Sequence, residues 1–248
     1  MAISKGSSTG RETCCFTLAV ERYDAQAMEC IVYEGDREQG ICCRSFTELA
    51  CQLERGCEEM DYPTPTVQKR EFLAAVKDRG YEADDQAVSG RKDGRLATLR
   101  VRIKQCFHAT WQGQVEMDGK GQDGVLFSSF LEFVMILDEM LTGNRCVLRM
   151  EGGSLADDLA NALLLAGRYS GIWVGERESA EVLICGRTLK DGGKEIFAVR
   201  PIFRENHTYQ GSVSWMGGRQ QKNFRSLLEL LCLMMSAAGK QAQKEDGI

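Results

Sequence analysis

The sequence lacks any apolar stretch of the ~18 consecutive residues that a membrane-spanning helix requires. It begins MAISKGSSTGRET, which has no apolar core of the kind that marks a secretory signal. We therefore expect a soluble, cytoplasmic protein with no membrane contact. With 43% apolar residues in a chain of 248, the sequence has ample material for a hydrophobic core.

Positive charge is not in excess either, because 31 Lys and Arg residues against 36 Asp and Glu residues give a formal net charge of −5. Proteins bind nucleic acids largely by neutralising phosphates, so this balance disfavours a nucleic-acid partner. One basic stripe is an exception, since Arg100, Arg102 and Lys104 share a strand face by period two. A solvated strand face is the ordinary meaning of such a stripe, and a phosphate-binding groove is the alternative.

Histidine is scarce. The two histidines, His108 and His207, each stand shortly before an aromatic-Gln-Gly triplet, and neither has a partner spaced for a metal site or a catalytic triad. Cys106 beside His108 is the one conceivable pairing of a nucleophile with a base. We predict no catalytic residue, and this scarcity disfavours an enzyme.

Cysteine is abundant, with eleven residues, of which seven lie in the first 57 positions. The odd total and the absence of a secretory signal argue against a disulfide framework. The close pairs Cys14-Cys15 and Cys42-Cys43 are adjacent, so their side chains point to opposite faces of a strand and do not match the Cys-x-x-Cys spacing of zinc sites. We expect reduced, buried thiols, no metal and no cofactor.

The most informative feature is a passage that occurs three times: an alternating apolar stretch, a second such stretch, then Ser-x-x-Glu and a strongly apolar run. The copies are Phe16 to Cys57, Leu99 to Leu141 and Ile196 to Ala238. The second contains TWQGQV and FSSFLEF, and the third contains TYQGSV and FRSLLEL. The first has diverged, with Met28 at the tryptophan position and Cys30 at the glycine position, but it keeps CRSFTEL.

The Ser-x-x-Glu element predicts a capping box at the start of a helix in each copy. The pairs are Ser45 with Glu48, Ser129 with Glu132 and Ser226 with Glu229. The helix that follows in the first copy is apolar on one side, whereas those of the second and third copies are apolar nearly all round. Such helices must be covered on more than one side, by another layer of the same chain or by a second subunit.

Two inserts join the copies. In the first, Thr66 to Arg79 predicts a helix with Phe72, Leu73 and Val76 facing inward, and Ala83 to Gly94 predicts a loop. In the second we expect a helix at Ser154 to Ala166, a turn at Gly192-Gly193, and strands at Cys146 to Met150, Gly171 to Gly175 and Glu181 to Cys185. In the third copy Pro201 predicts an edge strand, because proline cannot donate a hydrogen bond to a neighbouring strand.

The expected fold is α+β: three β–β–α pseudo-repeats with mainly antiparallel sheet packed on apolar helices, plus one α/β insert. The expected organisation is 1–62, the divergent Cys-rich first module; 63–95, a helical linker; 96–145, the second module; 146–194, the insert; 195–240, the third module; and 241–248, a tail.

The strings from Thr110 and Thr208 resemble a short repeat of small proteins from gut Firmicutes, in which Trp-Gln-Gly on alternating strands precedes Phe-Arg-Ser and a Leu-Glu-Leu helix. The resemblance covers the second and third copies, and the first departs from it because it lacks the aromatic-Gln-Gly. The resemblance implies a bacterial protein and a shared module. It implies no activity, cofactor or catalytic residue.

Two places are candidate sites. Gly152, Gly153 and Ser154 follow an expected strand and open an expected helix, where backbone N–H groups can bind an anion, although Ser154 with Asp157 equally makes an ordinary cap. The second candidate is the aromatic-Gln-Gly region, either as core packing or as an exposed recognition surface or dimer contact. Its residues are Trp111, Gln112, Tyr209, Gln210 and Trp215.

These observations favour a non-catalytic protein-interaction or assembly module, which binds a protein partner or itself through apolar helices or strand edges. The alternative is a sensor or enzyme for a small phosphate- or nucleotide-containing ligand at the Gly152-Gly153 turn. A nucleic-acid-associated protein is the third hypothesis.

Overall fold

The computed structural model describes residues 14–24, 28–72, 87–119, 124–144, 154–165, 172–174, 182–187, 194–205 and 207–238. Within these ranges the chain has an α+β fold with four helices and two antiparallel sheets. The helices are α1 (Phe46–Glu59), α2 (Phe130–Thr142), α3 (Leu155–Leu165) and α4 (Leu227–Ala238). None of these helices is long and apolar enough to cross a membrane.

The larger sheet has seven strands in the described ranges. Their order is β4 (Ala87–Val88), β3 (Gly40–Cys43), β2 (Met28–Glu34), β1 (Cys14–Tyr23), β5 (Ala97–Gln105), β6 (Gln112–Met117) and β7 (Val125–Phe127). The smaller sheet has five. Their order is β12 (Gln220–Phe224), β11 (Thr208–Trp215), β10 (Lys194–Glu205), β9 (Val182–Arg187) and β8 (Ile172–Val174).

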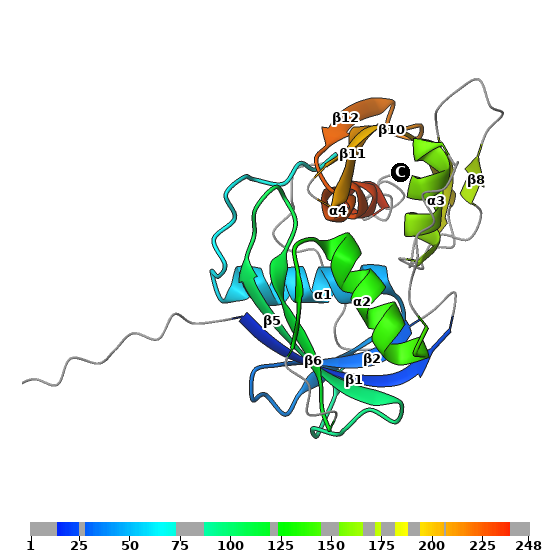
Figure 1. The fold of residues 1–248 in the computed structure, drawn as a ribbon. Helices are drawn as coiled ribbons and strands as arrows, with labels where there is room; N and C mark the ends of the chain where they lie inside the picture. Colours follow the sequence, from blue (N-terminus) through cyan, green and yellow to red (C-terminus); the bar gives the residue numbers. More distant parts are fainter. Residues whose placement is uncertain are drawn as a thin grey trace, which may run out of the picture.

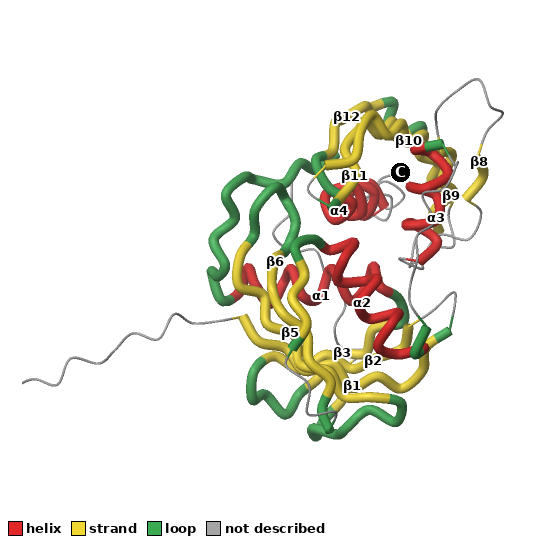
Figure 2. Tube along the Cα trace, in the orientation of Figure 1, coloured by secondary structure: helices red, strands yellow, loops and turns green. Residues whose placement is uncertain are grey.

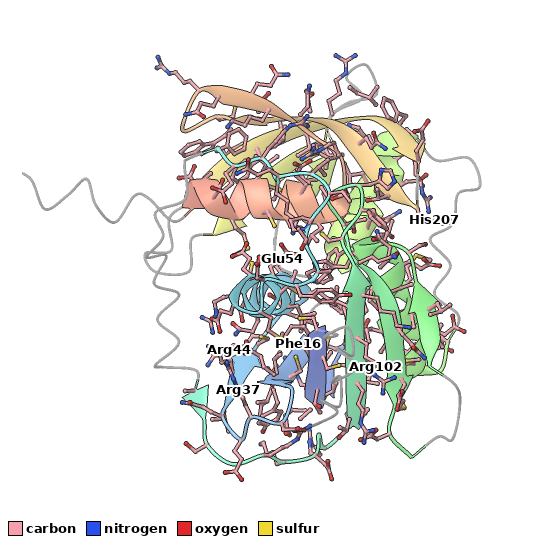
Figure 3. The ribbon with its side chains drawn as sticks, turned by 90° about the vertical axis from the view of Figure 1, so that its left-hand side faces the viewer. Phe16, Arg37, Arg44, Glu54, Arg102 and His207 are labelled. Atoms are coloured by element: carbon pink, nitrogen blue, oxygen red, sulfur yellow. The ribbon has the colours of Figure 1, made fainter. Side chains whose placement is uncertain are left out.

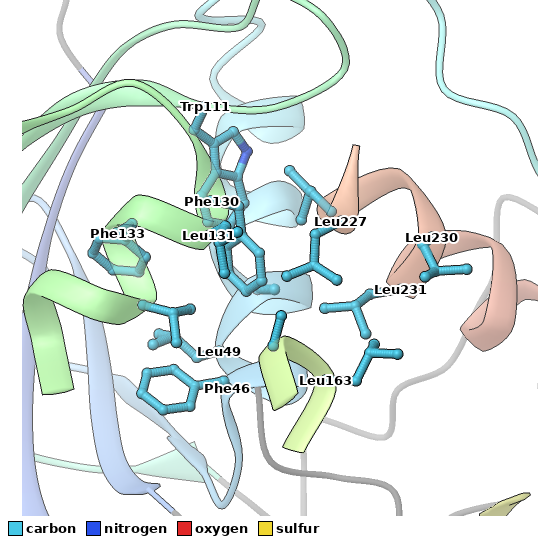
Figure 4. Packing of buried hydrophobic residues seen from close by; sticks show 14 of the residues in the cluster. Phe46, Leu49, Trp111, Phe130, Leu131, Phe133, Leu163, Leu227, Leu230 and Leu231 are labelled. Carbon is cyan, nitrogen blue, oxygen red and sulfur yellow. The ribbon is translucent and has the colours of Figure 1, made fainter. Parts of the chain in front are cut away.

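The helices lie between the two sheets. Figures 1 and 2 show α1 and α2 over one face of the seven-stranded sheet, and α3 and α4 between these helices and the five-stranded sheet. Leu227 and Leu231 of α4 lie in one buried cluster with Leu131 of α2 and Leu49 of α1 (Figure 4). The apolar helices were expected to be covered either by another layer of the same chain or by a second subunit. The structure shows the first, because a helix between a sheet and other helices is enclosed on several sides.

Three segments of the chain have the same order of elements, namely three antiparallel strands followed by a helix. The first segment is β1, β2, β3 and α1; the second is β5, β6, β7 and α2; the third is β10, β11, β12 and α4. Each first hairpin contains a register irregularity at the same place, after the pairs Val20 with Cys30, Ile103 with Gly113 and Pro201 with Gly211.

Each of these segments also begins its helix with the expected serine cap. The hydroxyl groups of Ser45, Ser129 and Ser226 accept hydrogen bonds from the N–H groups of Glu48, Glu132 and Glu229. These bonds satisfy N–H groups that the helix itself leaves without partners. The glutamates differ from the capping box in one respect, because their carboxylates accept not from the serine's own N–H but from that of the preceding residue, Arg44, Ser128 or Arg225, each at 2.7 Å.

The prediction of a helix over Thr66 to Arg79 is wrong for the residues of this range that the structure describes. Residues 66–72, which we call the strap, are not helical, and residues 73–86, with Leu73 and Val76, lie outside the described ranges. The strap instead crosses to the third segment, where its backbone bonds to Glu229 and Ser236. These tertiary bonds replace those that a helix would make within itself. The loop expected over Ala83 to Gly94 contains the short strand β4, which pairs with Gly40 and Ile41.

The edge position expected for Pro201 is also wrong, because β10 lies between β9 and β11. The register irregularity with β11 follows Pro201 directly. Proline is tolerated there because it sits at a bulge. The expected insert elements are present as α3, β8 and β9, whereas Cys146 to Met150 and Gly192-Gly193 lie outside the described residues.

Candidate functional site

The aromatic side chains proposed for a recognition surface are buried. Trp111 is 1% exposed, Tyr209 0% and Trp215 8%. The Trp111 indole N–H donates to the carboxylate of Glu54, which lies on the side of α1 facing α4 (Figure 3), and the Trp215 indole N–H donates to Glu195 at 2.6 Å. These rings therefore form no exposed interaction surface, and the packing alternative is confirmed.

The glutamine of the motif holds a turn. The Gln112 amide accepts from the N–H of Phe107 at 2.8 Å and donates to the carbonyls of Phe107, Thr110 and Ser128, each at 3.2 Å. These bonds fix the β5–β6 turn, in which His108 and Ala109 adopt φ angles of 53° and 57°. Gln210, the counterpart in the third segment, is likewise half-buried.

The residues around the two motif copies also join the second segment to the third. The Ser129 hydroxyl donates to the carbonyl of His207, and the Ser226 hydroxyl donates to the carbonyl of Ala109, each at 2.7 Å. The contact is reciprocal, because each helix-capping serine bonds to the left-handed turn of the other segment. His207 thus contributes its backbone carbonyl to this contact, whereas His108 only precedes the acceptor Ala109 in its turn. Both histidine side chains are exposed.

Four of the described cysteines are buried, namely Cys14, Cys30, Cys43 and Cys106, and five are partly exposed. Cys14 of β1 and Cys57 of α1 have Sγ atoms 3.2 Å apart, and Cys30 pairs with Cys43 across β2 and β3. The hydrogen bond with Cys14, together with burial, raises the pKa of the Cys57 thiol, and burial raises the pKa of Cys106. Because the thiolate is the nucleophile and the metal ligand, these shifts disfavour both roles.

No group of three or more His, Cys, Asp or Glu side chains that could hold a metal ion occurs among the residues that the structure describes.

Two members of the basic stripe pair with acidic neighbours, and the third bonds to an uncharged amide. Arg100 pairs with Asp118 at 3.1 Å, Arg102 pairs with Glu116 at 3.4 Å, and Lys104 donates to Gln114 at 3.0 Å. Phosphate binding would have to break these pairs. The solvated strand face is the simpler description of the stripe.

Gly152 and Gly153 lie outside the described residues, so the ligand site expected there stays a prediction. Ser154 is exposed, and its hydroxyl and N–H both contact the carboxylate of Asp157, at 2.9 and 3.0 Å. The Asp157 N–H donates back to the Ser154 hydroxyl at 3.2 Å, as in an ordinary cap.

The strongest candidate site is the outer edge of the seven-stranded sheet, at β7. Val125 is 40% exposed and Leu126 66%, and no other described strand pairs with the far side of β7. A surface hollow of about 600 Å³ adjoins the strand and is lined by Tyr62, Lys104, Gln105, Gln112, Gly113, Leu126, Phe127, Ser128 and Glu132. The sequence indicates a short strand here but does not show that it lies at an edge.

Comparison of the chain with protein-family models, curated proteins and solved structures gives no match. Any function of the chain must therefore be inferred from the geometry of its described residues.

Proposed function

We propose that the chain contains three copies of one strand–strand–strand–helix unit, and that it is related to the Trp-Gln-Gly repeat proteins that the sequence resembles. The common register irregularity and the three serine caps support this. The insert with α3, β8 and β9 then stands between the second and third units.

We propose further that the protein is a non-catalytic interaction module that binds a protein partner through the β7 edge. The observation that carries the proposal is the exposure of Leu126 and Val125 on an open sheet edge. Sheet edges with free backbone groups and exposed apolar side chains favour pairing with another chain. Among the described residues that suggested chemistry, the aromatic rings pack in the core, Ser154 makes a helix cap and Gln112 bonds within a turn.

The test is site-specific photo-crosslinking in the native cell, with a photoreactive residue in place of Leu126. Met216, which is 51% exposed in the turn after β11, provides a matched apolar control position. We expect one discrete crosslinked partner from position 126 and none from position 216. Equal products from both positions, or none from position 126, would contradict the proposal.

A further inference from the structure

The last strand of each segment has a different neighbour. In the first segment β3 pairs with β4, which comes from the linker between the first and second segments. In the third segment β12 is flanked by the strap, which comes from the same linker. In the second segment β7 has no such neighbour in the part of the chain that the structure describes. The linker thus covers two of three comparable edges.

The strap binds the β12–α4 edge mainly through its backbone. The N–H of Arg70 donates to the Glu229 carboxylate at 2.9 Å, and the N–H of Phe72 donates to the Ser236 hydroxyl at 2.9 Å. Lys222 donates to the carbonyl of Glu71. Two further bonds join Arg70 to the carbonyl of Asn223 at 3.0 Å and Arg225 to the carbonyl of Gln68 at 2.6 Å.

One strap side chain anchors this segment. Phe72 is 4% exposed and packs against Phe197 and Trp215, with ring centroids 6.4 and 5.8 Å apart. The strap therefore combines backbone hydrogen bonds along the edge, one basic side chain and one buried aromatic ring.

The comparable positions of the second segment are open. Glu229 is 0% exposed beneath the strap, whereas its counterpart Glu132 is half-buried. Ser236 is 3% exposed, whereas its counterpart Glu139 is exposed. One Glu132 oxygen accepts from Ser128, and the other accepts no hydrogen bond from any described residue.

We propose that the β7–α2 edge docks a non-helical peptide segment of a partner protein, in the manner in which the strap docks on the β12–α4 edge. This inference rests on the proposed function and specifies the partner. The segment carries a basic residue for Glu132 and Glu139, and an apolar or aromatic residue for the hollow beside Leu126 and Phe127. In the strap, backbone groups bond to side chains of the edge, and a buried ring adds an apolar contact.

A second copy of the chain fits this edge less well. Pairing β7 with itself would bring the acidic groups Glu132 and Glu139 of two copies together, and like charges repel. A basic peptide avoids this repulsion.

The experiment uses the full chain and a phage-displayed library of random heptapeptides. Peptides enriched on the wild-type chain are synthesised with a fluorophore and titrated by fluorescence anisotropy. We expect enriched peptides to combine Lys or Arg with an apolar residue, and Leu126→Asp to weaken their binding at least tenfold. Asn223→Asp, the matched change on the occupied edge, should leave binding within twofold of wild type.

Three results would overturn the inference: no enriched peptide, binding that Leu126→Asp leaves unchanged, or binding that Asn223→Asp abolishes. A dimer seen by light scattering and lost in Leu126→Asp would also overturn it, because the occupant would be a second copy. If position 126 crosslinks a partner while no heptapeptide binds, this inference fails and the interaction function stands. If position 126 crosslinks no partner, the proposed function fails, and this inference fails with it.

Discussion

Gly113 and Gly211 sit where a side chain would strike the neighbouring strand. A Cβ atom on either would overlap a backbone carbonyl oxygen, that of Arg102 for Gly113 and that of Arg200 for Gly211. Backbone at a bulge cannot move aside as a side chain can. We therefore expect Gly113→Ala or Gly211→Ala to lower the free energy of unfolding by about 2 kcal/mol or more, as overpacked sites do.

Urea unfolding followed by circular dichroism measures this change. Gly124→Ala is the matched control, because its new Cβ would meet only the Gln114 side chain, which can rotate away. An equal effect of the substitutions at positions 113 and 124 would show that the strand carbonyl is not the obstacle.

The raised pKa values predict a loss of stability at alkaline pH. Burial raises the pKa of Tyr209 from 10.0 to about 12, and the hydrogen bond with Cys14 raises that of Cys57 above the ordinary thiol value of 9.0. A pKa raised on folding means that the native state favours the protonated form. The resulting stabilisation is complete below the unfolded pKa and is lost as pH rises through the folded pKa.

The melting temperature, measured in the presence of a non-thiol reductant, should therefore be nearly constant from pH 7 to 8.5. It should then fall progressively above pH 9. Cys57→Ser removes one titrating group and should make this fall shallower. A melting temperature that stays constant up to pH 11 would contradict the burial of these groups in the native state.

At the scale of single residues, the sequence predicts hydrogen bonds between neighbours in the chain but not those between residues far apart. The Ser-x-x-Glu spacing is sufficient to predict all three serine caps, because their geometry is set within one helical turn. The donation from Ser129 to His207 is not predictable in this way, because it joins residues far apart in the sequence. For the same reason the aromatic-Gln-Gly motif left packing and recognition open until burial was known.

The serines that cap α2 and α4 make a hydrogen bond to another segment, and the serine that caps α1 does not. Ser45 caps α1 locally, whereas Ser129 and Ser226 each also donate a hydrogen bond to the opposite segment. Ser45→Ala should therefore lower the free energy of unfolding by about 1 kcal/mol, the usual effect of losing a cap. Ser129→Ala and Ser226→Ala should each cost about 2 kcal/mol, because a carbonyl group also loses its donor.

Chemical denaturation of the three single variants and of the Ser129→Ala/Ser226→Ala double variant measures these effects. The two donated bonds belong to one contact, so the double variant should deviate from the sum of the single effects. Equal costs at Ser45 and Ser129 would mean that the inter-segment bonds add nothing to stability.

The elements that the sequence predicts wrongly are those whose conformation depends on contacts with residues far away in the chain. The strap contains the pattern of a polar-faced helix, yet its N–H groups bond to Glu229 and Ser236. Pro201 suggested an edge because a proline interrupts the hydrogen bonds between strands, but the bulge with β11 accommodates it. Local propensity is a weak prior in both cases, and tertiary contacts override it.

In the whole molecule, the two sheets enclose the helices. This arrangement accounts for the all-round apolar sequences of α2 and α4, since each contacts both a sheet and another helix. The sequence alone leaves a second subunit as an alternative cover for these helices. The periodicity of apolar residues shows that a helix is covered, but it does not show which part of the protein covers it. Within the described ranges, β7 is the edge of the seven-stranded sheet that lies beside α2, and its exposed apolar residues locate the candidate site.

The strap joins these layers, and Phe72 is the residue on which its attachment depends most. Phe72→Ala would remove a ring that is 4% exposed and packs on Phe197 and Trp215. The expected cost is about 3 kcal/mol, at the lower end for removing a buried phenylalanine. The strap should also detach locally, so the amides of Arg70 and Phe72 should exchange hydrogen much faster than in the wild type.

Urea unfolding and hydrogen exchange by mass spectrometry measure the two effects together. Phe107→Ala, at a ring that is 40% exposed, is the control and should change neither quantity appreciably. If Phe72→Ala destabilised the protein without faster exchange in the strap, the ring would act in the core alone. The β12–α4 edge would then not depend on Phe72 for its cover, and the comparison with the open β7–α2 edge would lose its anchoring element.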